Sequence, residues 1–300
     1  MPQQIPPPRE EGTTTTTETP LYWAAYGKRG APRLIVLHGG PGADHRYLLP
    51  QLLHLGEHYD LLFYDQRGGG QSKTGDNAPI TWQTHVADLA AIGREFSIQP
   101  LSIVAYSFGA LITLLYLIET YSDPALPKPL RLVLLDPAPL TKEYRRAFEE
   151  DFARRNRAPE ILRMREELNV SGLRTSDPDA YRQRAFELGV AGYFANPANA
   201  TDLTPFRVVG RVQQSVWESL GDFDLISAIK HADFPVLIVH GRDDPIPLAS
   251  STRAAEKLGA QIVVLDDCGH VPYVEQPTAL FAAVDRFLSE TDPITAPASA

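Results

Sequence analysis

The sequence is poor in cysteine, in long apolar runs and in clustered basic residues. One cysteine, Cys268, excludes an internal disulfide framework and is typical of a reducing compartment, so we expect a cytoplasmic protein. No apolar run reaches the roughly eighteen residues of a membrane span. The net charge is −9 and no block of basic residues stands out, which argues against a nucleic-acid partner.

The spacing of residues in the sequence also gives no indication of a metal or phosphate site. No group of histidine and cysteine has the spacing of zinc ligands, so we expect neither a metal nor another cofactor. The glycine-rich segment 38–42 lacks a lysine at P-loop spacing, which argues against phosphate binding. With 43% hydrophobic and 22% charged residues the composition is that of a globular protein, and 300 residues suffice for one domain with an insertion.

The two ends of the chain have no pattern of a packed core. Residues 1–12 contain four prolines and resemble neither a signal peptide nor a membrane helix, and we expect 1–19 to be disordered. The threonine-rich tract 13–17 is compatible with an edge strand or a loose segment. Residues 291–300 read as a disordered tail.

Short apolar runs alternate with longer helical patterns between these ends. Most runs do not alternate polar with apolar residues, which is typical of parallel strands covered on both faces. The predicted fold class is therefore α/β, a doubly wound, mostly parallel sheet with helices on both faces. The predicted strands are 34–37, 61–64, 101–105, 130–135, 236–239 and 262–265, and the predicted helices are 47–55, 82–96, 108–121, 251–258 and 277–288.

One stretch breaks this alternation. Residues 137–231 contain no convincing strand, and prolines and glycines punctuate charged helical segments instead. These segments are 142–157, 159–168, 178–193 and 205–220. We interpret 137–231 as a helical cap inserted between two parts of an α/β core, 20–136 and 232–290.

Reactive residues follow the ends of the predicted strands. Ligands of parallel sheets bind at the carboxyl ends of the strands, so these residues should meet at one edge. Ser107 stands in Ala-Tyr-Ser-Phe-Gly, where a strand turns sharply into a helix and presents the serine as a nucleophile. Ala105 occupies the place where glycine is usual, and it is small enough for such a turn.

A serine nucleophile needs a base and an acid that orients the base. His270 follows the last predicted strand and is our general base. Asp244 is the favoured acid, with Asp243 and Asp136 as alternatives. The chain order serine, aspartate, histidine suits a triad on this type of fold.

Backbone N–H groups must also stabilise the oxyanion that forms during acyl transfer. The amide of Phe108 is one expected donor and that of Gly40 the second, because glycine allows a close approach of the backbone. His38 is expected to be structural. Asp65 and Arg67 are expected to brace loops near the site, and Cys268 to fill buried space.

With these residues placed, the chain resembles the proline iminopeptidase family of α/β-hydrolases over about residues 20–290. The motifs that carry the resemblance are His-Gly-Gly-Pro-Gly at 38–42 and Asp-Gln-Arg-Gly-Gly-Gly-Gln-Ser at 65–72, followed by Gly-Arg-Asp-Asp at 241–244 and Gly-His at 269–270. The resemblance implies an α/β-hydrolase fold with an inserted helical cap. It also implies release of an N-terminal residue, often proline, from short peptides.

Family enzymes hold the ammonium of the substrate with acidic side chains from the cap and near the catalytic acid. In this chain Gln213 and Pro245 stand where glutamates would be expected, and Glu218 or Glu187 would have to substitute. An aminopeptidase of this type is the first prediction. An esterase, amidase or lactonase acting on an uncharged small molecule is the alternative, and a binding protein without turnover is a third.

The predicted partner is therefore a small molecule or a short peptide, neither nucleic acid nor membrane. The predicted substrate-binding residues are Gly39, Tyr106, Gln213, Trp217 and Glu218. The sequence does not indicate the oligomeric state.

Overall fold

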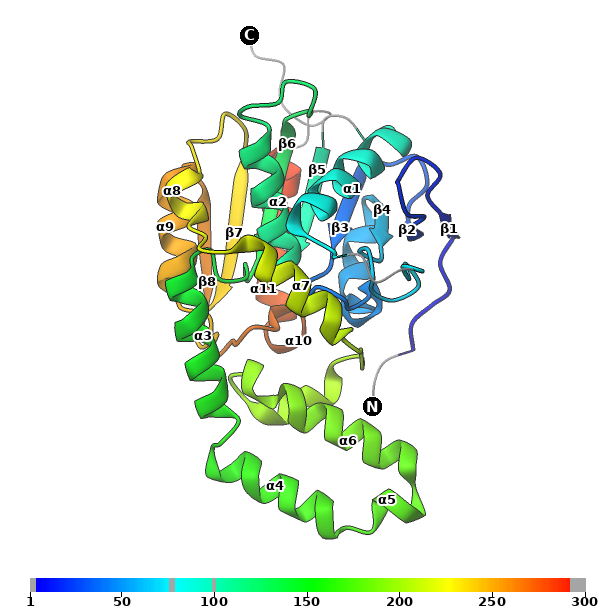
Figure 1. Cartoon of the computed structure of the whole chain (residues 1–300), viewed down its shortest axis with the longest axis vertical. Helices are drawn as coiled ribbons and strands as arrows, with labels where there is room; N and C mark the ends of the chain where they lie inside the picture. The colour runs from blue at the N-terminus through cyan, green and yellow to red at the C-terminus, as the bar shows by residue number, and fades with distance from the viewer. Residues whose placement is uncertain (1–3, 76–78, 99–100, 292–300) are drawn as a thin grey trace.

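Eight strands form one sheet in the order β1-β2-β4-β3-β5-β6-β7-β8 in this computed structural model, which describes residues 4–75, 79–98 and 101–291 (Figure 1). β2 pairs antiparallel with both β1 and β4, and all neighbours from β4 to β8 pair in parallel. The strands are β1 Glu10–Thr13, β2 Tyr22–Gly27, β3 Arg33–Leu37, β4 Asp60–Tyr64, β5 Leu101–Tyr106, β6 Pro129–Leu135, β7 Val236–Gly241 and β8 Gln261–Leu265. The predicted α/β class is confirmed.

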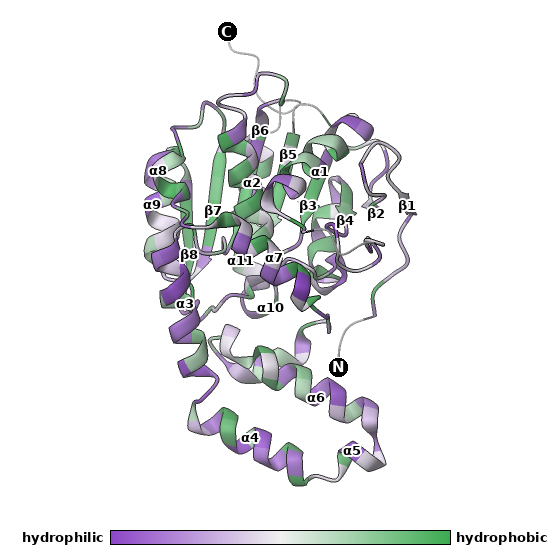
Figure 2. Cartoon of the chain, viewed as in Figure 1, coloured by the Kyte–Doolittle hydropathy of each residue, from purple (hydrophilic) through white to green (hydrophobic). Residues whose placement is uncertain are grey.

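Successive side chains of a strand point to opposite faces of the sheet, and in this molecule both faces are buried under apolar clusters. In β3, Ile35 and Leu37 join one apolar cluster while Leu34 and Val36 join the other. This explains why the strands are continuous apolar runs, which form the hydrophobic centre of the molecule (Figure 2).

Helices cover the two faces of the sheet. Buried residues of α1, α2, α8 and α9 belong to one cluster, and those of η1, η2, α10 and α11 belong to the other. Pro50 separates η1 from η2, so the predicted helix 47–55 is instead two 3-10 helices. The core helices are η1 His45–Leu48, η2 Gln51–Glu57, α1 Trp82–Glu95, α2 Phe108–Glu119, α9 Leu248–Leu258, α10 Pro272–Glu275 and α11 Pro277–Glu290.

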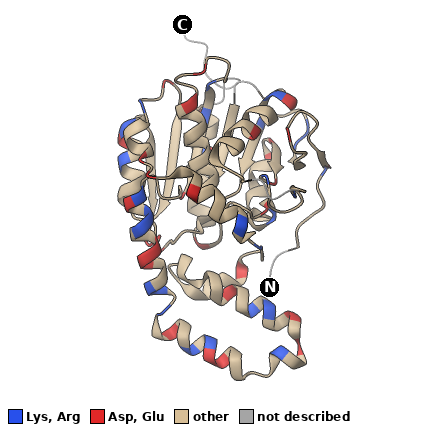
Figure 3. Cartoon of the chain, viewed as in Figure 1, with Lys and Arg blue, Asp and Glu red and all other residues tan. Residues whose placement is uncertain are grey.

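The segment between β6 and β7 is helical, as its pattern predicts. Residues 137–231 are all described, and within them β pairing is limited to a single bridge between Thr141 and Asp224. We call 137–231 the helical insertion. It contains α3 Lys142–Arg155, α4 Pro159–Val170, α5 Leu173–Ser176, α6 Pro178–Val190, η3 Ala191–Tyr193, η4 Pro197–Asp202, α7 Gly210–Leu220 and α8 Leu225–Ala228. Its helices α4 to α6 form an arm at one end of the molecule and are rich in charge (Figures 1 and 3).

The N-terminal part differs from its prediction. Glu10–Thr13 form edge strand β1 against β2, so the expected disorder of 1–19 is wrong there. The guanidinium of Arg9 donates to Asp60 at 2.7 Å, and the backbone N–H of Thr15 donates to Glu95 at 2.8 Å. The sequence pattern does not indicate this strand, because backbone hydrogen bonds to β2, and not an apolar run, define it. Residues 1–3 and 292–300 lie outside the described part, and with them most of the predicted tail.

None of the helices in the described part has the length and apolar content that crossing a bilayer would need.

Candidate active site

Ser107 occupies a sharp turn between a strand and a helix. Strand β5 ends at Tyr106 and α2 begins at Phe108, so the serine belongs to neither element. Its backbone angles, φ 52° and ψ −116°, lie in a region that non-glycine residues rarely adopt. This is the strained turn that the pattern around residue 107 predicts, and it lifts the hydroxyl group out of the sheet.

Three side chains that are far apart in the sequence meet at this turn. The Oγ atom of Ser107 lies 2.9 Å from Nε2 of His270, and Nδ1 of His270 lies 2.7 Å from Oδ2 of Asp244. Ser107 follows β5, Asp244 follows β7 and His270 follows β8. The carboxyl ends of three parallel strands of one sheet thus bring the three predicted residues into one hydrogen-bonded chain, which we call the relay.

The imidazole of His270 is held by the insertion and by the core. The backbone N–H of His270 donates to the carbonyl oxygen of Tyr193 at 2.7 Å, and the hydroxyl of Tyr106 donates to the carbonyl oxygen of His270 at 2.8 Å. The rings of Tyr106 and Tyr193 each lie with their centroid 5.2 Å from that of the imidazole. These contacts restrict the ring to an orientation that serves both Ser107 and Asp244.

The two neighbouring aspartates after β7 have different surroundings. Asp243 is exposed, whereas Asp244 is buried and its Oδ1 accepts the N–H of Ile246 at 2.7 Å. Burial alone would raise the pKa of Asp244, but the charge and hydrogen bond of His270 outweigh it and hold this pKa below its ordinary value. The geometry therefore favours Asp244 over Asp243 as the acid.

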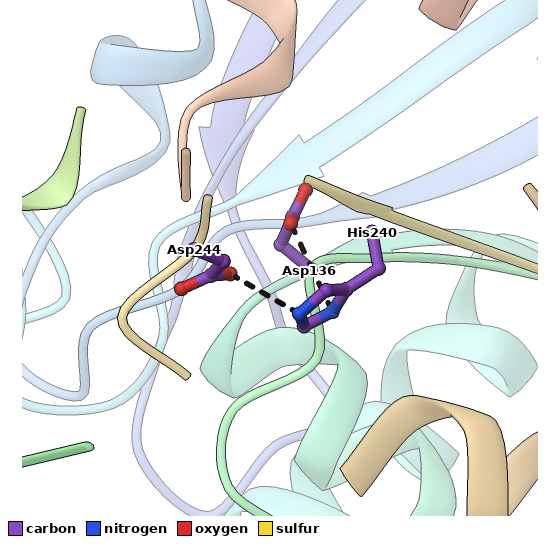
Figure 4. A group of neighbouring side chains, drawn as sticks. All are labelled: Asp136, His240 and Asp244. Atoms are coloured by element: carbon purple, nitrogen blue, oxygen red, sulfur yellow. Dashed lines mark ion pairs between the residues drawn. The ribbon is translucent and has the colours of Figure 1, made fainter. Parts of the chain in front are cut away.

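Asp136, the third candidate, lies beside Asp244 and His240 (Figure 4). Ligand atoms of these three residues lie within 4.8 Å of one another, a spacing that could suit a metal ion. However, both ring nitrogens of His240 are engaged, with Ser251 at 2.9 Å and with the carbonyl oxygen of Ile246 at 3.1 Å. Because Asp244 is also committed to His270, the group does not fit a metal.

The backbone around Ser107 supplies both expected oxyanion donors, Phe108 and Gly40, at positions close to the serine. The N–H of Phe108 is the first of a helix and has no acceptor within that helix. Gly40 has φ +56°, which favours glycine, and it lines the cavity in front of Ser107. The neighbouring N–H of Gly39 is occupied, because it donates to the hydroxyl of Tyr47 at 2.5 Å. These positions are those that the sequence predicts for an oxyanion hole.

A cavity of about 90 Å³ opens beside Ser107 and His270, and we call it the site cavity. Apart from the His270 ring, its lining consists of uncharged residues, and aromatic rings dominate it. Four of these rings belong to tyrosines. The lining residues are Gly40, Tyr47, Tyr106, Ser107, Val190, Tyr193, Leu203, Phe206, Val208, Gln213, His270, Val271 and Tyr273.

The predicted substrate-binding residues fall into two groups. Tyr106 and Gln213 line the site cavity, and Gly39 lies so close that a Cβ there would stand 2.6 Å from the Cβ of Ser107. Trp217 and Glu218 instead line a second cavity of about 410 Å³, which shares Gln213 with the site cavity. The structure thus separates these two from the relay.

Carboxylates of the insertion are engaged with other side chains. The buried Glu187 accepts hydrogen bonds from Arg184 at 2.8 Å and Gln183 at 3.0 Å, and it does not line the site cavity. Glu149, in the second cavity, accepts from Arg145 at 2.9 Å, and Glu218 accepts from Gln214 at 2.7 Å. No carboxylate is therefore aimed into the site cavity among the described residues.

Loops around the site are braced as predicted. His38 is buried, its Nδ1 donates to the carbonyl oxygen of Gly39 at 2.7 Å, and burial lowers its pKa so that the ring stays neutral. The carboxylate of Asp65 accepts the ring Nδ1 of His45 at 2.7 Å. Arg67 makes two hydrogen bonds to Asp88, at 3.0 and 2.7 Å.

Glu275 on α10 is a residue that the sequence analysis missed. Its carboxylate accepts the backbone N–H groups of Gly269 at 2.7 Å, Asn196 at 3.1 Å and Ala195 at 3.2 Å. It therefore ties the loop before His270 to the insertion. An acidic residue five positions after His270 is the sequence feature that could have pointed to it. Its bracing role depends on contacts with residues 195 and 196, which spacing along the chain does not reveal.

Comparison with known proteins shows the family to which this chain belongs. Residues 34–284 match the model of the alpha/beta hydrolase family. The chain belongs to that family. The proline iminopeptidase of Lactobacillus helveticus (strain DPC 4571) is 24% identical over 298 residues, which cover 90% of this chain and 95% of that protein. The resemblance that the motifs indicate is therefore confirmed.

Solved structures agree on the fold. A proline iminopeptidase-related protein from Thermus thermophilus superposes with a TM-score of 0.72 at 22% identity, covering 95% of this chain and 98% of that one. The enol-lactonase from Burkholderia xenovorans LB400 superposes with a TM-score of 0.63 at 20% identity, covering 93% and 100%. One fold thus accommodates proteins with different names and substrates.

Proposed function

We propose that this alpha/beta hydrolase is a serine hydrolase that works through an acyl-enzyme. The observation that carries the proposal is the relay, with Ser107, His270 and Asp244 joined at 2.9 and 2.7 Å. A serine hydroxyl becomes a useful nucleophile when a neutral imidazole accepts its proton and a carboxylate orients that imidazole.

The proposed reaction has two halves. Oγ of Ser107 attacks the substrate carbonyl while its proton moves to Nε2 of His270, and the N–H groups of Phe108 and Gly40 stabilise the resulting oxyanion. The intermediate collapses, and His270 returns the proton to the leaving group. Water, deprotonated by the same imidazole, then attacks the acyl-serine; the second intermediate collapses, His270 returns the proton to Oγ of Ser107, and the acid is released. Asp244 stabilises the imidazolium in both halves.

The site cavity defines the acyl group that we propose. Its volume of about 90 Å³ suits a small group, and its aromatic lining suits an uncharged one. A buried ammonium without a carboxylate partner would be costly. We therefore propose a small ester, amide or lactone with an uncharged acyl part.

An aminopeptidase of the proline iminopeptidase type is the second candidate, and the name of the curated relative supports it. The helical insertion would act as the cap that this family resemblance implies. The ammonium would have to reach Glu149 or Glu218 in the second cavity, which shares Gln213 with the site cavity. This candidate therefore requires a longer path from the scissile bond to the anchor.

Three matched substrates separate the candidates: an aminoacyl anilide with a free amine, its N-acylated form, and a p-nitrophenyl ester of a small neutral acid. We expect turnover of the ester. We also expect the anilide with a free amine and its N-acylated form to differ in kcat/KM by less than about threefold. A preference for the free amine of about a hundredfold or more would contradict the uncharged-acyl proposal.

Glu218→Gln tests the second candidate directly. If Glu218 anchors an ammonium, this variant loses the preference for the free amine, while Glu167→Gln on the exposed part of α4 keeps it. A protein that turns over none of the three substrates and does not react with a fluorophosphonate would support the third prediction, a binding protein.

A further inference from the structure

Asp136 is a buried carboxyl group that the relay does not use directly. It follows β6, is 0% exposed and has φ +40°, an uncommon angle for a non-glycine residue. Its Oδ1 accepts the N–H of Gly241 at 2.8 Å, but no donor of the described residues reaches its buried Oδ2. A buried carboxylate oxygen without a donor is costly, so this side chain needs an explanation.

Among the described residues, the charged groups that act most strongly on Asp136 are negative. Asp244 and Glu275 add negative charge, and burial lowers the pKa of the neighbouring His240, which keeps that ring neutral at pH 7. Cys268, Tyr106 and Tyr273 also interact with Asp136, and all three are neutral when protonated.

Carboxyl oxygens of Asp136 and Asp244 lie within 4.8 Å of each other. Two carboxyl groups this close in a buried site do not both ionise. Asp244 has the better claim to the charge, because it receives the N–H of Ile246 at 2.7 Å and the imidazole of His270 at 2.7 Å. Asp136 receives one N–H, and its second oxygen receives none. Burial and the charge of Asp244 raise the pKa of Asp136 well above its ordinary value.

We propose that Asp136 is a neutral carboxylic acid at pH 7 whose O–H donates to the carboxylate of Asp244, an oxygen of which lies within 4.8 Å of the Asp136 carboxyl group. A protonated carboxyl group can supply the donor function that an ionised one lacks. The bond satisfies Oδ2 and fixes the carboxylate that orients His270. Asp136 is thus a positioning residue of the relay, and this inference rests on the proposed function.

The effect of this arrangement is to spread the charge of Asp244. A hydrogen bond from a neutral acid stabilises the carboxylate and adds no charge of its own near the imidazole. An ionised Asp136 would instead add a second negative charge and favour protonation of His270, the form that cannot accept the proton of Ser107. The two states of Asp136 therefore predict different pH dependences of catalysis.

Asp136→Asn distinguishes the two states. The amide is neutral, can donate to Asp244 and accept from Gly241, and asparagine tolerates positive φ. We expect kcat/KM within about threefold of the wild type and an acid limb of the pH profile that moves by less than about 0.3 pH unit. A limb that moves to lower pH by about one unit would show that a negative charge was removed and would overturn the proposal.

Asp136→Gly removes the donor while suiting the positive φ. We expect kcat/KM to fall about tenfold, with the acid limb moving to higher pH because the carboxylate of Asp244 has lost its donor. Restoration by asparagine but not by glycine supports positioning by a neutral donor. A glycine variant with wild-type kcat/KM and profile would overturn it. Asp243→Asn, one residue from Asp244 and exposed, is the matched control and should leave both unchanged.

Infrared difference spectroscopy tests the protonation state without reference to activity. Wild type minus Asp136→Asn at pH 7 should show the loss of a carboxylic acid C=O band, and its position should shift in D₂O. Loss of a carboxylate band instead would overturn the proposal. Because this measurement does not depend on turnover, its result stands even if Ser107 is not the nucleophile, so the two failures can be told apart.

Discussion

The sheet and the helical insertion are held together in different ways. Every residue of β4, β5 and β7 is buried. In the insertion, α3 has no buried residue and α4 has two, Ile161 and Leu168. Hydrophobic burial therefore stabilises the sheet far more strongly than the arm formed by α4 to α6 (Figure 2).

Charge shows the opposite distribution. The helices α3, α4 and α6 have ion pairs on their surfaces, such as Arg145 with Glu149 at 2.9 Å and Arg163 with Glu167 at 3.6 Å (Figure 3). Exposed pairs of this kind contribute little to stability, about 0.3–0.5 kcal/mol for pairs four residues apart.

This difference assigns separate tasks to the two regions. The strand ends place Ser107, Asp244 and His270 on the rigid part of the molecule, where small displacements would be costly. The insertion supplies Tyr193, Phe206 and Gln213 to the site cavity. We expect chemistry to depend on the sheet and substrate choice to depend on the insertion.

The largest expected effect comes from the relay at the sheet edge. Asp244→Asn should lower kcat by about 10⁴-fold, because the amide cannot stabilise the imidazolium or hold the required tautomer. Asp243→Asn should change kcat by less than about twofold, since Asp243 is exposed and the partner of His270 Nδ1 is Asp244. Steady-state kinetics on the ester substrate measures both, and equal losses in the two variants would contradict the assignment.

Truncation of an apolar side chain should destabilise the protein strongly in the sheet and only slightly in the insertion. Ile238→Ala on β7, at 0% exposure, should lower the free energy of unfolding by about 2–5 kcal/mol. Leu162→Ala on α4, at 49% exposure, should lower it by less than about 0.5 kcal/mol. Urea unfolding of both variants checks this. Similar losses would show that the arm is as tightly packed as the sheet.

Acid should weaken the core through His85 of α1. This side chain is buried against the ring of Phe108, and burial lowers its pKa from 6.5 to about 3, with the charge of Arg67 adding to the effect. Between these two values the unfolded chain binds a proton that the folded chain does not, so stability falls as pH falls below about 6.5. From pH 7 to 5 this loss is about 2 kcal/mol.

His85→Gln removes this titration. The variant should therefore lose about 2 kcal/mol less than the wild type when urea unfolding at pH 5 is compared with pH 7. Equal pH dependence in the two proteins would show that His85 is not held neutral in the fold.

The smallest effect is expected on the surface of the arm. Arg163→Ala should change the free energy of unfolding by less than about 0.5 kcal/mol, because its pair with Glu167 is exposed and spans a single turn. A loss above about 1.5 kcal/mol in thermal or urea unfolding would mean that charge, and not burial, stabilises the arm.

The two regions also differ in how far the sequence predicts them. The inner strands, such as β3 and β7, are apolar on both faces, so their runs were found within two residues of the observed ends. Strands β1 and β2 at the sheet edge were not predicted. β1 is polar and β2 consists of aromatic residues, alanines and a glycine, without the Leu, Ile and Val run that indicates the inner strands. Pairing of backbone groups defines both.

The site was predictable where chemistry and chain order agree. Ser107 and His270 could be placed from the turn pattern and the strand ends. Asp244 was favoured as the acid but Asp243 stayed an alternative, because the local turn decides which side chain points inward. The aromatic lining of the site cavity was mostly invisible in the sequence. Tyr47, Tyr193 and Tyr273 come from separate segments, and each looks like an ordinary core residue until the chain is folded.

Reaction with a fluorophosphonate, followed by intact mass and peptide mapping, tests the central claim most directly. We expect one adduct per chain, on Ser107, and no adduct in Ser107→Ala. His270→Ala should fold but label at least about a hundredfold more slowly, because the hydroxyl has lost its base. Labelling of Ser107→Ala at the wild-type rate, or an adduct on another residue, would contradict the account.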